Sequence, residues 1–471
     1  MQLALIVQLS IAALAMELAG MLPLGALEGA LAAAGAPLLV LLGGAIAARR
    51  AERLLDAREA GVESFDRFAS RAPWVATGML LAAAMSGLPP WLADSIGGVG
   101  VAVALMACGI AASMAVSASA WRIERRLREA TLVGALDQSR PVHPMPSRWR
   151  FVVAKARSGI APLLVPLLIP LAGSEGARML AEGRLSPEAV ELARLAGGIA
   201  GLALLFALVP FIVPPLLGLV RMPGGELRDD LEGLARGAGV GVRELWVWPT
   251  DGLVANAAVM GVFPGLRCVM LTDALLESMP RAQVRAVMAH ELGHVARHHL
   301  PWMVAVVVAC WTVAGAAATP VAREALMALA PRFAPEDWTA LGQSVALARD
   351  AAVLAAGLVL FGLASRRFER QADTYAVQLL SRGEGSDTAT GSAVDAMVGA
   401  LGSVAYLNHV RPERPSWRHG SIAWRQGYLR GIAGARLDGM AIDALIAWVS
   451  WISLLVALGS LAWIFLPAAV G

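Results

Sequence analysis

The sequence predicts a mainly α-helical, polytopic membrane protein with about nine transmembrane helices and one polar α+β domain. Hydrophobic residues make up 57% of the chain and charged residues only 16%, against about 25% charged in a soluble domain. The mean hydropathy is +0.63. Such a composition indicates that the chain lies in a lipid bilayer. The net charge of +3 is too small to indicate nucleic acid as a partner.

Nine apolar segments have, or nearly have, the ~20 residues that a membrane-spanning helix needs. They lie at 3–23, 30–48, 73–91, 97–119, 156–173, 195–220, 301–320, 346–364 and 441–467. No Lys or Arg precedes the first segment, so we do not expect it to be a signal peptide. The fifth segment contains three prolines, and we expect it to be kinked.

The distribution of arginine predicts the orientation of these helices. Loop 49–72 contains six Arg and loop 121–158 contains eight, whereas the intervening loops near 24–29 and 92–96 contain none. Arg-rich loops stay in the cytoplasm. With nine spans, this places the N-terminus inside, the C-terminus outside and the polar domain in the cytoplasm.

The polar domain is predicted to be divided in two by a membrane hairpin. Within it, 228–237 is typical of a short helix, and 244–249 and 267–271 are rich in strand-forming residues. The predicted organisation is an N-terminal transmembrane region, the first piece of the domain, a hairpin, the second piece and a C-terminal helix: 1–220, 221–300, 301–364, 365–440 and 441–471.

Residues 290–294 read His-Glu-Leu-Gly-His, the H-E-x-x-H pattern of zinc proteases. Residues 280–289 lead into it with Pro in the first turn and apolar residues at helical spacing. On a helix, positions i and i+4 share one face. His290 and His294 can therefore bind one Zn²⁺ per chain, with Glu291 beside them as the general base that activates a water.

A second motif supplies a carboxylate. Residues 365–373 read Ser-Arg-Arg-Phe-Glu-Arg-Gln-Ala-Asp, and together with H-E-x-x-H they resemble the M48 family of membrane metallopeptidases. The resemblance implies a gluzincin-type domain that hydrolyses polypeptides. It makes Glu369 the third zinc ligand and Asp373 a residue that orients a ligating histidine.

Two further segments resemble elements of the same family. Residues 419–425 resemble its late H-P-[ST]-x-x-x-R element, with Gly420 in place of Pro. The resemblance implies that His419 stabilises the oxyanion and that Arg425 braces the site. Residues 256–261 resemble the N-A-x-x-x-G edge strand, which implies that an extended substrate binds along Asn256, Ala257 and Ala258.

Two other histidines allow a different ligand set. A third metzincin-type histidine would lie at position 300, which is Leu, and the Gly expected at 297 is Arg. We therefore expect His298 and His299 to be interfacial polar residues at the foot of the seventh span.

The sequence favours a zinc endopeptidase acting on membrane-associated or misfolded proteins at the cytoplasmic face of a bacterial inner membrane. The alternatives are a CaaX-type processing protease, an M56-like regulatory or sensor protease and an inactive membrane scaffold.

Overall fold

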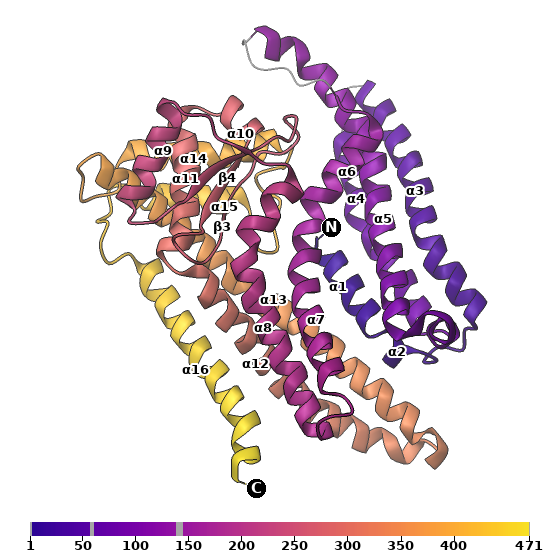
Figure 1. Ribbon diagram of the computed structural model, residues 1–471. Helices are drawn as coiled ribbons and strands as arrows, with labels where there is room; N and C mark the ends of the chain where they lie inside the picture. The colour runs from indigo at the N-terminus through magenta and orange to yellow at the C-terminus, as the bar shows by residue number, and fades with distance from the viewer. Residues whose placement is uncertain (1, 57–60, 138–144, 471) are drawn as a thin grey trace. The chain divides into compact units, whose positions relative to one another are not determined.

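The computed structural model describes residues 2–56, 61–137 and 145–470, and the chain is mainly helical, as predicted (Figure 1). It divides into two compact units, one up to Leu205 and one from Phe206 onward. The predicted five-part organisation stays a prediction.

The first unit is a helical bundle. It comprises α1 (Gln2–Ala13), α2 (Ala15–Leu18), α3 (Ala26–Asp56), α4 (Gly61–Ala84), α5 (Leu88–Asp137), α6 (Arg148–Gly159), α7 (Ala161–Ala181) and the first half of α8 (Pro187–Leu217). Buried alanines on α3, α4 and α5, among them Ala36, Ala76 and Ala112, pack against one another. Small side chains let membrane helices approach closely, which compensates for the weak hydrophobic drive between helices in lipid.

The second unit combines a small sheet with helices. It contains β1 (Val220–Arg221), α9 (Glu226–Gly237), β2 (Glu244–Trp248), β3 (Ala257–Met260), β4 (Cys268–Thr272), α10 (Asp273–Ser278), α11 (Arg281–Ala296), α12 (His299–Leu329), the short 3-10 turns η1 (Ala330–Arg332) and η2 (Pro335–Asp337), α13 (Trp338–Gly383), α14 (Gly391–Leu407), α15 (Ile422–Gly431) and α16 (Ala441–Val470). The predicted helix at 228–237 and the predicted strands at 244–249 and 267–271 are confirmed to within two residues.

The strand order is β1-β2-β4-β3, so β3 lies at the edge of the sheet. Strands β2 and β4 are parallel, and β3 pairs antiparallel with β4. Buried side chains such as Leu245 on β2, Leu271 on β4, and Met288 and Leu292 on α11 form one hydrophobic core. This core fixes α11 against the sheet.

Among the described residues, six helices are long and apolar enough to cross a membrane. They cover Ala26–Leu55, Leu88–Glu129, Pro187–Leu217, His299–Arg332, Pro335–Gly383 and Ala441–Ser460. Each of these helices corresponds to one of the nine predicted spans, although the predicted spans 195–220 and 441–467 extend past Leu217 and Ser460. The total of nine stays a prediction.

Three predicted spans differ from the helices that form. Segment 3–23 is broken, because α1 ends at Ala13 and the four-residue α2 follows. Segment 73–91 crosses the boundary between α4 and α5. Segment 156–173 is divided between α6 and α7, and the side chains of 161–167 lie outside the described part of the chain.

The predicted loop at 92–96 is wrong. These residues are helical within α5, and the chain departs from helical geometry only at Gly97, where φ is +69°. Hydropathy detects the interruption in apolar character, but polar residues at a membrane surface do not have to end a helix.

In the second unit, the long helices extend away from the sheet in the same general direction. The chain enters the sheet from α8, leaves it by α12, returns by α13 and leaves again by α16. Figure 1 shows α12, α13 and α16 running side by side away from the sheet, and α12 packs against both of the others.

Candidate metal centre

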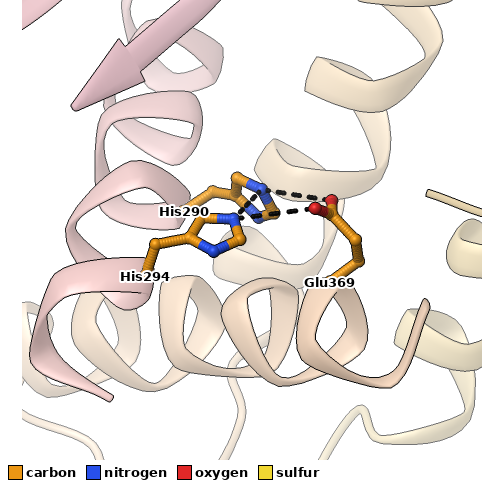
Figure 2. Close-up of side chains that lie close together, drawn as sticks. All are labelled: His290, His294 and Glu369. Carbon is orange, nitrogen blue, oxygen red and sulfur yellow. Dashed lines mark hydrogen bonds and ion pairs between the residues drawn. The ribbon is translucent and has the colours of Figure 1, made fainter. Parts of the chain in front are cut away.

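Helices α11 and α13 bring together His290, His294 and Glu369 (Figure 2). Gly293, inside the motif, is buried where α11 crosses α13. A Cβ added there would lie 3.1 Å from Tyr375 Cδ1 and 3.2 Å from the Ala372 carbonyl oxygen. The absence of a side chain at this position therefore permits the close helix approach that places Glu369 opposite the two histidines.

Each of the three side chains offers one possible ligand atom, and these atoms all lie within 4.8 Å of one another. The two Nε2 atoms are 3.3 Å apart. Glu369 Oε2 lies 3.7 Å from His290 Nε2, and Oε1 lies 3.8 Å from His294 Nε2. A metal ion between these atoms could bind two imidazole nitrogens and one carboxylate, which is the donor set of a catalytic zinc site.

A buried carboxylate orients His290. Asp373 Oδ1 lies 2.9 Å from His290 Nδ1, and the Asp373 side chain has no exposed surface. The guanidinium of Arg425 donates to both Asp373 oxygens, through Nε at 2.7 Å and Nη2 at 2.6 Å. An acceptor at Nδ1 stabilises the tautomer that carries its hydrogen there, which leaves the Nε2 lone pair for a metal. The carboxylate also raises the pKa of His290, even though burial acts in the opposite direction.

His294 has a different electrostatic environment. Burial, together with the neighbouring His290, lowers the pKa of His294 well below its usual value. The imidazole is therefore neutral at pH 7, and the neutral form is the one that binds metals.

Two nitrogen-bearing side chains lie next to the carboxylate of Glu369. His419 Nδ1 lies 2.9 Å from Glu369 Oε1, and Arg425 Nη1 lies 3.3 Å from Oε2. Arg425 thus contacts two carboxylates of the site, Glu369 and Asp373. The His419 side chain is half exposed, so its ring lies at the open edge of the site.

Gly420 explains one departure from the family pattern. Its φ is +74°, a left-handed conformation that glycine adopts readily and that proline, fixed near −65°, cannot. The turn that carries His419 therefore has a different backbone from a His-Pro turn, yet it still brings His419 to Glu369.

Glu291 lies between the histidines and the edge strand. Burial in particular, together with the negative charge of Glu369, raises the pKa of Glu291 to about 7. The backbone N–H of Val259 donates a hydrogen bond to its carboxylate. A carboxylate with a pKa near the working pH suits proton transfer in both directions.

The edge strand presents alternate residues to its free side. Asn256 is exposed, and its carbonyl accepts from the N–H of Thr272 on β4. In an antiparallel pair the main-chain groups alternate in direction. Ala258 therefore directs its N–H and C=O to β4, and Ala257 and Val259 direct theirs to the free edge. The hydrogen bond from Val259 to Glu291 agrees with this alternation.

The prediction that His299 is an interfacial residue is wrong. His299 has no exposed surface, and its Nδ1 lies 2.8 Å from His294 Nδ1. The adjacent His298 is exposed and has φ of +53°, which ends α11 and starts α12 in a new direction. In an uninterrupted helix, position i+5 would lie far around the axis from His294. A histidine pair just after H-E-x-x-H was the available signal, but the turn was not predictable.

Residues 223–421 match the sequence profile of peptidase family M48. The chain contains a peptidase family M48 domain. The matched residues include both histidines, Glu291, Glu369, Asp373 and His419. The resemblance predicted from the two motifs is thereby confirmed for this part of the chain.

Individual proteins are similar to this chain over shorter stretches. CAAX prenyl protease 1 of Saccharomyces cerevisiae is 31% identical over 98 residues, which are 20% of this chain and 21% of the yeast protein. Protease HtpX of Chromohalobacter salexigens is 35% identical over 82 residues, 17% of this chain and 27% of that protein. The aligned segments thus span about a fifth to a quarter of the length of these relatives. The crystal structure of Saccharomyces mikatae Ste24p aligns with 85% of this chain and 98% of its own, with 15% identity and a TM-score of 0.43.

Proposed function

We propose that the protein is an integral-membrane zinc endopeptidase that hydrolyses peptide bonds at the membrane surface. The observation that carries the proposal is the cluster of His290, His294 and Glu369, whose ligand atoms are 3.3–3.8 Å apart. Glu291 lies next to this cluster and contacts the edge strand β3. A metal, a base and a strand edge are the parts that hydrolysis of an extended peptide requires.

A zinc ion held by these three residues would polarise the scissile carbonyl and make a water molecule more acidic. Glu291 accepts the proton of the attacking water and passes it to the leaving amine. His419, at the open edge of the site, donates a hydrogen bond to the developing oxyanion. Arg425 and Asp373 keep His290 and Glu369 in their orientations.

The proposed substrate is an extended segment of polypeptide. It pairs with the outward main-chain groups of Ala257 and with the carbonyl of Val259, beside Asn256, so recognition depends on an unfolded backbone more than on particular side chains. The metal-binding residues also lie close to long apolar helices: α12 begins five residues after His294, and Glu369 belongs to α13 itself. Membrane-associated and misfolded proteins provide both an unfolded backbone and a location close to the apolar helices.

We place the protein in a bacterial inner membrane, with the site on the cytoplasmic face. The Arg-rich stretches at 49–72 and 121–158 support this orientation through the positive-inside rule. The chain enters and leaves the sheet-bearing part through α8, α12, α13 and α16, which supports one aqueous compartment for the site.

A CaaX-type processing protease is a second candidate, because a yeast relative carries the name CAAX prenyl protease 1. The two functions differ in substrate. An endopeptidase of the first kind cleaves unfolded polypeptides at internal positions. A CaaX-type enzyme cleaves only near the C-terminus of a prenylated peptide.

The experiment compares the purified full-length protein with its Glu291→Gln variant. Both should contain one zinc per chain by elemental analysis, because the ligands are unchanged. Only the unmodified protein should cleave an unfolded protein such as casein, since the variant lacks the proton acceptor. Absence of zinc in the unmodified protein, or clear cleavage by the variant, contradicts the proposal. Cleavage restricted to prenylated peptides selects the CaaX-type function.

A further inference from the structure

A line of polar side chains leads from His294 to the C-terminal helix α16. His294 Nδ1 lies 2.8 Å from His299 Nδ1, and His299 Nε2 lies 3.0 Å from Gln371 Oε1. Gln371 Nε2 donates to Asp443 Oδ1 at 2.8 Å. His299 and Gln371 are buried. Asp443 lies in the first turn of α16, so the line joins four helices: α11, α12, α13 and α16.

Only one assignment of hydrogen-bond donors and acceptors is possible along this line of side chains. An ionised aspartate only accepts, so Gln371 presents its NH₂ to Asp443 and its carbonyl to His299. That carbonyl requires His299 to carry hydrogen on Nε2. Neutral His299 then has an acceptor at Nδ1, and only His294 can donate to it. His294 is thereby held with its hydrogen on Nδ1 and its lone pair on Nε2, the atom that faces His290 and Glu369.

The far end of the line is anchored firmly. Asp443 Oδ2 accepts from Arg297 Nη2 at 3.3 Å and from Gln378 Nε2 at 3.4 Å. Arg297 also donates to Gln378 Oε1 at 3.0 Å, and its guanidinium stacks over the Tyr375 ring. These contacts hold the end of α11, the middle of α13 and the start of α16 together, so Asp443 has little freedom to turn away from Gln371.

We propose that His299, Gln371 and Asp443 are positioning residues that fix the tautomer and orientation of His294, so that helix α16 contributes to metal affinity. The inference rests on the proposed metal centre. Asp373 and Arg425 hold His290 from α13 and α15, and this second line holds His294 from α12, α13 and α16. Each histidine therefore has its own support, and loss of one support leaves the other intact.

The test uses the full-length protein in detergent with Zn²⁺ alone as the probe. The variants are His299→Phe, Gln371→Met and Asp443→Leu, and His298→Asn is the matched control. Asn tolerates the left-handed backbone at that position, and His298 is exposed. Zinc affinity is measured by competition with a chelator. We expect each of the three variants to bind zinc about 10- to 100-fold more weakly and the control to match the unmodified protein.

A second measurement separates positioning from general loss of structure. In metal-free protein labelled with ¹⁵N-histidine, the imidazole shifts of His294 should show hydrogen on Nδ1, and the variants should lose this preference. Gln371→Met and Asp443→Leu act at a distance from the ligand, so they remain informative should His299→Phe fail to fold. Asp443→Asn keeps an acceptor oxygen for Gln371 and should lose less affinity than Asp443→Leu.

The outcomes distinguish this inference from the proposed function. Failure of the unmodified protein to bind zinc overturns both. Suppose that the unmodified protein binds stoichiometric zinc, that the folded variants bind zinc with affinities within threefold of the unmodified protein, and that the His294 tautomer is unchanged. This result overturns the positioning role and leaves the metal centre intact. Weaker binding together with a changed tautomer supports the positioning role.

Discussion

Replacing Asp373 should show that this residue contributes separately to the stability of the domain and to its affinity for metal. Asp373 has no exposed surface and Arg425 is 9% exposed at the side chain. Asp373→Ala leaves the buried guanidinium with one carboxylate neighbour, Glu369, at 3.3 Å. Removing one partner of a buried ion pair costs about 3–5 kcal/mol of unfolding free energy. For a domain of this size that corresponds to a fall in Tm of about 6–20 °C.

The same change removes the acceptor at His290 Nδ1, so zinc affinity should fall about 10- to 100-fold. A double variant, Asp373→Leu with Arg425→Met, replaces the pair by apolar side chains of similar size. Such replacements are often neutral for stability, so the Tm should return to near that of the unmodified protein. The zinc affinity should not recover, because His290 still lacks its acceptor.

Thermal unfolding of the metal-free protein is monitored by tryptophan fluorescence. Zinc affinity is measured separately by competition with a chelator. Recovery of zinc affinity along with stability in the double variant would refute the reasoning, since Asp373 would then act only as the counter-ion of Arg425. A single variant that lost less than about 1 kcal/mol would show that solvent reaches the pair.

Further predictions concern the ligands, the metal, the oxyanion and the topology. Glu369→Ala should lose zinc and activity together, whereas His298→Asn should keep both, as measured by elemental analysis and peptide cleavage. Removing the metal with a chelator should abolish cleavage and lower the unfolding free energy by the amount that binding contributes, about 2.7 kcal/mol at 100 times the dissociation constant; added Zn²⁺ should restore both. His419→Ala should retain zinc but lower kcat about 10²- to 10³-fold, as for removal of one oxyanion donor. A reporter active only in the cytoplasm should be active when fused after Arg128 and near Gly385; activity at only one of these positions would show that the chain crosses the membrane an odd number of times between them.

The parts of the site that follow from short-range geometry were predictable from the sequence. His290 and His294 are one helical turn apart, so their shared face depends only on the helix, and α11 forms where Pro280 and the apolar spacing predict it. Asp373 likewise follows Glu369 by four residues on α13. The positions of Glu369 and His419 relative to the histidines required the family resemblance, because 75 residues separate Glu369 from His294.

Features that depend on tertiary packing were not predictable. His299 is beside His294 only because His298 takes a left-handed conformation. Its partner Gln371 lies 72 residues further along the chain, and Asp443, which Gln371 contacts, lies another 72 residues beyond Gln371. The prediction of the number of membrane spans from the sequence has a similar limit. Hydropathy averages over a window, so it merges the end of α4 with the start of α5 and divides α5 near Gly97.

The arrangement of α13 links the membrane region to the chemistry. One continuous helix, Trp338–Gly383, contains an apolar half and then, within five residues, Glu369, Gln371 and Asp373. Glu369 and Asp373 are one helical turn apart and share a face, whereas Gln371 points to another side of the helix axis. Glu369 faces the two imidazoles, Asp373 holds His290, and Gln371 turns to His299 and thus to α16. A rotation of α13 about its axis would therefore disturb a ligand and both histidine supports at once. Because the same helix packs against α12 over much of its length, the geometry of the metal centre depends on how the membrane helices pack.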